Sequence, residues 1–173
     1  MKKIALLLIL VMTLALTGCA GNTPKEQQQP KNQTETQVQT PAPEKVKVTL
    51  YFANEKADAL VPVEREINKP GDMVVGLIEE LKKPDKYAPV LPEGTELVFY
   101  RTEGDVLVLN FNQAFANMQG TTGEAITINS LVNTLTELPQ YKSVKLLVDR
   151  NPLTTGHAIY DKPLQRNESV IQK

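Results

Sequence analysis

The chain has 173 residues, of which 19 are lysine or arginine and 20 are aspartate or glutamate, so its formal net charge is −1. Because binding to phosphates needs an excess of positive charge, this balance argues against nucleic acid as the main partner. One cysteine, Cys19, and one histidine, His157, exclude an internal disulfide and the metal sites built from four cysteines, two cysteines with two histidines, or three histidines. No residue pattern indicates a cofactor.

The chain begins with the features of a secretion signal. Lys2 and Lys3 precede an almost wholly apolar run at 4–16, which is too short to cross about 30 Å of hydrocarbon as a helix. The following sequence, LTGC, ends at Cys19 and resembles the bacterial lipobox, in which the cysteine is acylated and the peptide is cut before it. We therefore expect residues 1–18 to be a lipoprotein signal peptide, with an ordinary secretory signal as the alternative.

The composition changes sharply after Cys19. Residues 20–45 are rich in Gln, Thr and Pro, and Val38 is their only large apolar side chain. Such a segment cannot bury enough apolar surface to offset the conformational entropy lost on ordering. We predict a disordered tether over 19–45, beginning at the lipidated cysteine. It would hold the following domain close to a membrane, because two acyl chains anchor a protein stably.

The folded domain is predicted to begin at 46 with two strands. Apolar residues occupy every second position of 46–52, which is typical of a half-buried strand. A second strand is predicted at 60–67, where Pro62 lacks a backbone N–H and favours a sheet edge or a bulge. Arg65 falls on the apolar face of this strand, so its guanidinium must reach water or a carboxylate.

Two amphipathic helices are predicted. The first begins after Asp72, a suitable N-cap, and ends before Pro84. Thr121 and Glu124 have the spacing of a capping box at the start of the second helix, which ends before Pro139. The apolar face of the second helix comprises Ile128, Leu131, Val132, Leu135 and Leu138.

Three further strands complete the predicted domain. The segments 95–101 and 106–111 flank Glu103-Gly104-Asp105 as a hairpin, and 143–149 is the last strand. The element order is therefore β-β-α-β-β-α-β. It predicts the α+β class, with two helices packed on one face of a five-stranded sheet that is mixed and largely antiparallel.

Several segments together carry a family resemblance. They are LVPVER at 60–65, LPEGT at 91–95, INSLVNTLTELP at 128–139, and Gly156-His157 followed by Pro163-Leu164. With the lipobox and the tether, they resemble the GerMN domain of sporulation and spore-germination lipoproteins. The resemblance covers 46–166 and leaves 167–173 as a C-terminal tail.

The resemblance implies a location on the outer face of the cytoplasmic membrane and a fold similar to the small ring-building modules of secretion-type complexes. In sporulation, such a lipoprotein supports the complex that joins mother cell and forespore. The family has no established catalytic residues. The chain departs from the pattern in two ways: it has one GerMN-like domain where the sporulation protein has two, and Arg150 follows Asp149 where a glycine is common.

The residues themselves supply no recognisable catalytic set. As a general base, His157 would need an orienting carboxylate and a nucleophile, but none of the three serines lies in a Gly-x-Ser-x-Gly context. Glu79 and Glu80 are adjacent on a predicted helix and are interpreted as a solvated face. We expect the protein not to be an enzyme and His157 to be a surface or loop histidine, with a partner contact as the alternative.

The candidate interface residues are polar side chains on predicted elements. Two interpretations of Arg65 stay open: an ion pair with a carboxylate such as Glu137, or a contact with a partner. Asn129 and Asn133 are four residues apart and share a helix face, which is either solvated or an interface. The complete set comprises Arg65, Asn129, Asn133, Thr134 and His157.

These observations favour a non-enzymatic interaction module that is anchored in the cell membrane through Cys19 and faces the extracytoplasmic side. Its expected partners are membrane lipid and envelope or sporulation-complex proteins, with self-association as a further possibility. One alternative is an envelope lipoprotein that binds a cell-wall polymer or a small ligand. Another, disfavoured by the missing nucleophile and metal ligands, is a wall hydrolase.

Overall fold

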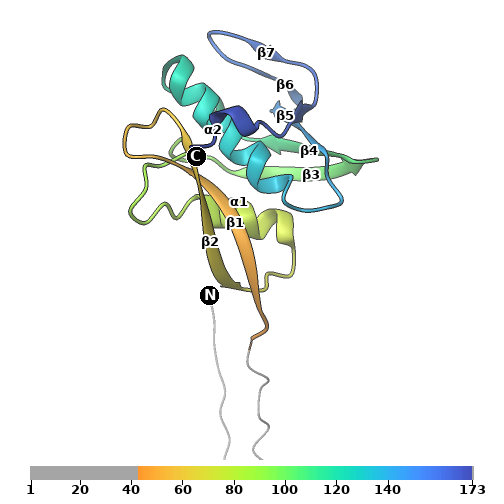
Figure 1. Cartoon of the computed structure of the whole chain (residues 1–173). Helices are drawn as coiled ribbons and strands as arrows, with labels where there is room; N and C mark the ends of the chain where they lie inside the picture. Colours follow the sequence, from red (N-terminus) through yellow and green to blue (C-terminus); the bar gives the residue numbers. More distant parts are fainter. Residues whose placement is uncertain (1–42, 173) are drawn as a thin grey trace, which may run out of the picture. The chain divides into compact units, whose positions relative to one another are not determined.

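A computed structural model describes residues 43–172, so the predicted signal peptide, Cys19 and most of the predicted tether lie outside the described part of the chain. The first two strands, β1 (Lys45–Ala53) and β2 (Leu60–Asn68), pair antiparallel along their whole length as a separate ribbon (Figure 1). Within the described residues β2 forms a ladder only with β1, which confirms the expected edge position of Pro62.

The register of this ribbon explains why a proline is tolerated in it. Pro62 lies opposite Tyr51, and the backbone N–H and C=O of Tyr51 point away from β2 to side chains of a helix. Because paired residues of an antiparallel ladder alternate between bonded and non-bonded positions, the ladder needs no N–H from Pro62.

The second sheet contains six strands. Its order is β3-β4-β5-β6-β7, and β8 also pairs with β5. The β4–β5 pair is parallel and the other pairs are antiparallel. The strands are β3 (Leu97–Glu103), β4 (Val106–Phe111), β5 (Ser143–Val148), β6 (Asn151–Thr154), β7 (Ile159–Tyr160) and β8 (Leu164–Gln165).

The α+β class and a mixed, largely antiparallel sheet are therefore confirmed. The structure differs from the expected five-stranded sheet because the first two strands form their own ribbon. Three short strands after β5 were not expected, since segments of two to four residues are too short to display a hydrophobic period.

Two tight turns in the second sheet use left-handed backbone. The predicted hairpin between β3 and β4 is confirmed, with a two-residue turn in which Gly104 has a φ of +62°. The β5–β6 turn places Asp149 and Arg150 at φ values of +48° and +69°. This conformation costs an L-residue about 1–2 kcal/mol, and the side chain of Asn110 supports the turn by accepting a hydrogen bond from the Arg150 N–H.

The two helices begin at different kinds of cap. In α1 (Met73–Leu81), the Asp72 side chain accepts a hydrogen bond from Val75 N–H, as predicted. In α2 (Gly120–Leu135), the cap residue Gln119 makes no side-chain cap bond, so the predicted capping box is wrong. Leu138 lies beyond the end of α2 but still packs on the core. Among the described residues, neither helix combines the length and apolarity needed to cross a bilayer.

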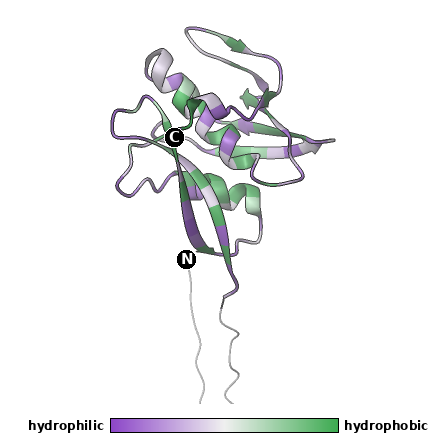
Figure 2. Ribbon diagram, viewed as in Figure 1, coloured by the Kyte–Doolittle hydropathy of each residue, from purple (hydrophilic) through white to green (hydrophobic). Residues whose placement is uncertain are grey.

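The core lies where the ribbon, the helices and the second sheet meet. Helix α2 packs on β1, β5 and β8, and α1 packs on β1 and α2 (Figure 1). Hydrophobic and hydrophilic residues alternate along the strands and helices, whereas the connecting loops are mostly hydrophilic (Figure 2). The largest fully buried side chains are Phe52, Phe111, Phe115, Leu50, Leu60, Leu77, Ile78, Leu81, Leu107, Leu109, Leu131 and Leu135.

Two hydroxyl groups of α2 satisfy the backbone at the free edge of β1. The N–H of Tyr51 donates to Thr134 Oγ1 at 3.1 Å, and Ser130 Oγ donates to the Tyr51 carbonyl at 2.5 Å. Both side chains are fully buried. Because Ser130 and Thr134 are one helical turn apart, both reach Tyr51 and supply the hydrogen bonds that a neighbouring strand would make at this residue. Further along the same edge, Ala53 forms a β-bridge with Ala88.

The substitution Thr134→Val tests this contact. It keeps the shape of the side chain but leaves the buried Tyr51 N–H without an acceptor, which should lower the free energy of unfolding by about 1–3 kcal/mol. Urea unfolding measures the change. The matched control is Thr122→Val on the exposed part of α2, which should change it by less than about 0.5 kcal/mol. Equal losses in the two variants would contradict the assignment.

Candidate functional site

The side chain of Arg65 is held inside the protein by its own ion pairs. It is only 14% exposed, and its guanidinium lies 3.3 Å from Glu80 Oε2 and 2.7 Å from Asp85 Oδ2. It also lies 4.8 Å from the centre of the Phe52 ring. The predicted ion pair is therefore confirmed, but its carboxylates come from α1 and the following loop, not from Glu137.

Glu80 is the acidic residue whose environment was predicted wrongly. It is only 16% exposed and is shared between Arg65 and Lys83, so it does not belong to a solvated face. Its neighbour Glu79 is exposed and pairs with Lys82, as a solvated residue should. Adjacent residues on a helix point in different directions, so only one of the two glutamates faces the ribbon.

The α2 residues proposed as an interface are mostly buried. The side-chain amide of Asn133 donates to the Asn167 carbonyl and accepts from the Asn167 N–H, both at 2.9 Å. Thr134 accepts a hydrogen bond from the Tyr51 N–H, and neither Asn133 nor Thr134 has accessible surface for a partner. Asn129 is half-buried and donates back to the Ala125 carbonyl of its own helix.

The C-terminal segment, residues 164–172, joins the separate parts of the fold. Arg166 lies 4.8 Å from the centre of the Tyr51 ring, bonds to the Tyr51 hydroxyl, and pairs with Glu137 at 2.8 Å. At its end, Gln172 N–H donates to the Leu60 carbonyl at the start of β2. Within the predicted tail, Asn167 contacts α2 and Gln172 contacts the ribbon, so residues 167–172 belong to the folded domain.

Three tyrosines are bonded to carboxylates and have raised pKa values. Burial and the hydrogen bond to Glu137 raise the pKa of Tyr51. The hydrogen bond to Asp72, with burial, raises the pKa of Tyr100 to about 12. Burial and the hydrogen bond to Glu124 raise the pKa of Tyr160 to about 12.

Two charged partners of these tyrosines are also perturbed. Burial disfavours the charged form of Asp72, but hydrogen bonds from Tyr100 and from the Val75 N–H outweigh it and lower its pKa. Burial acts against the charge of Arg166, yet its bonds to Glu168 and Tyr51 raise its pKa. All of these groups hold elements together, and none lies beside a free nucleophile.

His157 stands apart from the other candidate residues. It is exposed in the loop between β6 and β7, where its backbone N–H donates to Thr155 Oγ1. Within residues 43–172 its side chain has no hydrogen-bonding or ionic partner, and no group of acidic or histidine residues is placed to hold a metal ion. The structure therefore does not bring the five predicted interface residues together.

The open edge of β3 is a surface that the sequence did not reveal. This strand pairs only with β4 among the described residues and contains no proline. Its register shifts between Leu97 and Phe99, where Val98 has no partner on β4 and is 59% accessible. Since Glu103 and Val106 close the two-residue hairpin, the backbone groups of Tyr100 and Thr102 face away from β4. The edge of β2, in contrast, is protected by Pro62 and by two exposed glutamates, Glu64 and Glu66.

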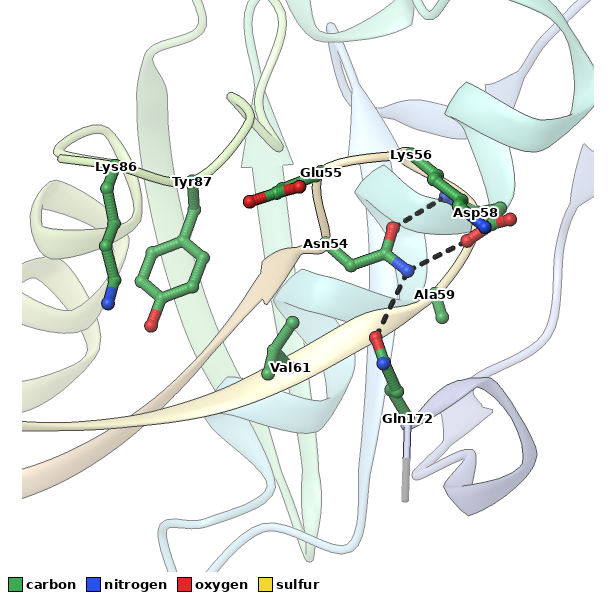
Figure 3. Close-up of a pocket in the computed structure, with 9 residues that line it drawn as sticks. All are labelled: Asn54, Glu55, Lys56, Asp58, Ala59, Val61, Lys86, Tyr87 and Gln172. Carbon is green, nitrogen blue, oxygen red and sulfur yellow. Dashed lines mark hydrogen bonds between the residues drawn. The ribbon is translucent and has the colours of Figure 1, made fainter.

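A polar pocket lies at the end of the ribbon (Figure 3). It has a volume of about 630 Å³ and is formed by the β1–β2 turn, the loop after α1 and the C-terminal segment. Its lining residues are Asn54, Glu55, Lys56, Asp58, Ala59, Val61, Lys86, Tyr87 and Gln172. No residue of the predicted site lines this pocket.

This small α+β domain, with an open sheet edge and no assembled catalytic set among its described residues, belongs to the Germane family, described as sporulation and spore germination, whose model matches residues 49–154. It is similar to the structure of the tandem GerMN domains of the sporulation protein GerM from Bacillus subtilis, with 28% identity and a TM-score of 0.62. That match covers 74% of this chain and 48% of the tandem structure, so the chain spans about half of it.

The structure of the first GerMN domain of the same Bacillus subtilis protein is also similar in fold. Its TM-score is 0.56 at 19% identity, and the match covers 70% of this chain and 98% of that domain. No curated protein matches the chain by sequence. The expected GerMN resemblance is therefore confirmed.

The raised pKa values predict how stability depends on pH. The ordinary pKa of tyrosine is 10.0, and Tyr100 and Tyr160 reach about 12 in the folded protein. The two protonated hydroxyls therefore contribute to the free energy of unfolding, and this contribution is fully present below pH 10. It is lost as the pH rises toward 12, where the hydroxyls ionise in the folded protein as well. The double variant Tyr100→Phe/Tyr160→Phe should lose stability less steeply above pH 10 in urea unfolding. Parallel pH profiles for the variant and the parent protein would contradict this.

Proposed function

We propose that this protein is a non-enzymatic interaction module held at the extracytoplasmic face of the bacterial membrane by a lipidated Cys19, and that it acts in sporulation or spore germination. Membership of the Germane family supports the sporulation or germination role. The lipobox-like sequence before Cys19 supports the anchor. The module binds an envelope or sporulation-complex protein.

The observation that carries the interaction role is the open edge of β3. A strand edge with free backbone groups, no proline and an exposed apolar side chain is suited to pairing with a strand of another protein. Val98 supplies apolar contact at one end of this edge, and Arg101 and Glu103 supply charge at the other. The edge of β2, in contrast, carries Pro62, whose missing N–H makes it unsuited to pairing with another strand.

The internal bonding of the polar side chains supports a non-enzymatic role. Four ionisable side chains that are buried or half-buried are bonded within the fold: Arg65, Glu80, Glu124 and Arg166. Every buried side-chain nitrogen or oxygen among the described residues has a hydrogen-bond partner. A catalytic base or nucleophile needs a free atom directed at a substrate, and these groups have other partners.

Lipid anchoring is tested by replacing the only cysteine. In cells that carry Cys19→Ala, a clickable fatty acid should no longer label the protein, because the acyl acceptor is lost. The mature, lipid-anchored form of the protein should then be absent from the membrane fraction. The control Ala20→Ser keeps Cys19 and should stay labelled. Labelling that persists in Cys19→Ala would show that the anchor lies elsewhere.

The interaction surface is tested by site-specific photo-crosslinking in sporulating cells. A photoreactive amino acid at Val98 should capture one envelope protein, since this side chain borders the open edge of β3. The same amino acid at Glu64, an exposed position on the protected β2 edge, is the matched control and should capture much less. Absence of a crosslink at 98, or equal capture at both positions, would contradict an interface at β3.

A further inference from the structure

The pocket at the end of the ribbon has one wall that is fixed by hydrogen bonds. Asn54 Nδ2 donates to Asp58 Oδ1 at 2.8 Å and to Gln172 Oε1 at 3.2 Å, and Asn54 Oδ1 accepts from Asp58 N–H (Figure 3). Gln172 is itself held by its backbone bond to Leu60. The turn and the C-terminal segment therefore present their polar groups in a defined arrangement.

The opposite wall is aromatic and equally constrained. The ring of Tyr87 stacks on Phe52, with centroids 5.6 Å apart and an interplanar angle of 8°. Phe52 is fully buried, so it fixes the orientation of the Tyr87 ring. In Figure 3, Val61 lies between Tyr87 and the wall formed by Asn54 and Gln172. The pocket thus combines a rigid ring and an aliphatic surface with polar groups at its border.

Several polar groups of the pocket have no hydrogen-bond or ion-pair partner among the described residues. They are the Tyr87 hydroxyl, the side-chain NH₂ of Gln172, the second carboxylate oxygen of Asp58, and the charged ends of Glu55, Lys56 and Lys86. Lys86 Nζ lies 5.4 Å from the centre of the Tyr87 ring. Two lysines and two acidic residues balance, so the pocket offers both donors and acceptors without a net charge.

We infer that this pocket binds a saccharide unit of a neutral glycan. A sugar ring has an apolar C–H face that suits the aliphatic side chain of Val61, and a border of hydroxyl groups that suits phenol, amide, carboxylate and ammonium groups together. A phosphate-rich polymer would favour a cluster of positive charge, which Glu55 and Asp58 oppose. The volume of about 630 Å³ lies within the range of about 300–1,000 Å³ found for small-molecule sites.

The biological source of the sugar rests on the proposed function, because only an extracytoplasmic location brings the pocket near the glycan of the cell wall. Binding of the sugar itself does not depend on that location. A failure of the anchor or of the β3 interface would therefore leave the pocket intact, and a failure of sugar binding would leave the crosslink at Val98 unaffected.

The test uses the purified full-length lipoprotein in detergent micelles and the N-acetylglucosamine trisaccharide as the probe. Saturation-transfer NMR should detect binding, and titration gives its dissociation constant. Tyr87→Phe keeps the stacking on Phe52 but loses the hydroxyl, and Gln172→Ala loses the free amide. Each should weaken binding about three- to tenfold, the factor expected for one hydrogen bond. Lys142→Ala, an exposed lysine outside the pocket, is the control and should leave it unchanged.

Binding that weakens in both pocket variants and survives in Lys142→Ala supports the inference. Absence of saturation transfer to the trisaccharide, with the sugar at millimolar concentration, would overturn the inference. Binding that is unchanged in the double variant Tyr87→Phe/Gln172→Ala would also overturn it, since the sugar would then occupy another surface. Tighter binding of poly(glycerol phosphate) than of the trisaccharide would overturn the choice of a neutral glycan.

Discussion

The fold depends on how the free edge of β1 is closed. A two-stranded ribbon leaves one edge of each strand without a ladder, and buried backbone groups there need other partners. Ser130 and Thr134 supply these partners by bonding to the carbonyl and N–H of Tyr51. Because the same helix also packs on β5, this contact joins the ribbon and the six-stranded sheet around one core.

The polar residues around this contact form further hydrogen bonds and ion pairs within the fold, so their side chains are not free to bind a partner. Arg166 reaches the Tyr51 hydroxyl and Glu137, Asn133 pairs with the backbone of Asn167, and Arg65 fixes the other face of the ribbon to α1. With these groups bonded internally, the open β3 edge and the pocket beside Tyr87 are the two surfaces that we propose to meet partners. An interaction module that presents two distinct surfaces agrees with the proposed envelope role.

Apolar periodicity predicted the long elements because their burial repeats along the sequence. It failed at polar residues whose partners are distant in sequence: Asn133 and Thr134 are buried by the C-terminal segment and β1. The ion pair of Arg65 followed from its place on an apolar strand face, but its partner depended on tertiary packing. The β3 edge and the pocket could not be predicted, since both depend on which strands pair and where the chain ends meet the ribbon.

Residue-resolved amide hydrogen exchange of the full-length protein tests most directly the claim that β1 is closed and β3 is open. The N–H of Tyr51, bonded to Thr134, should exchange only through global unfolding, whereas the outward N–H groups of Tyr100 and Thr102 should exchange rapidly. If the Tyr51 N–H exchanged as fast as those of Tyr100 and Thr102, the contact between α2 and β1 would not be the interaction on which the fold depends.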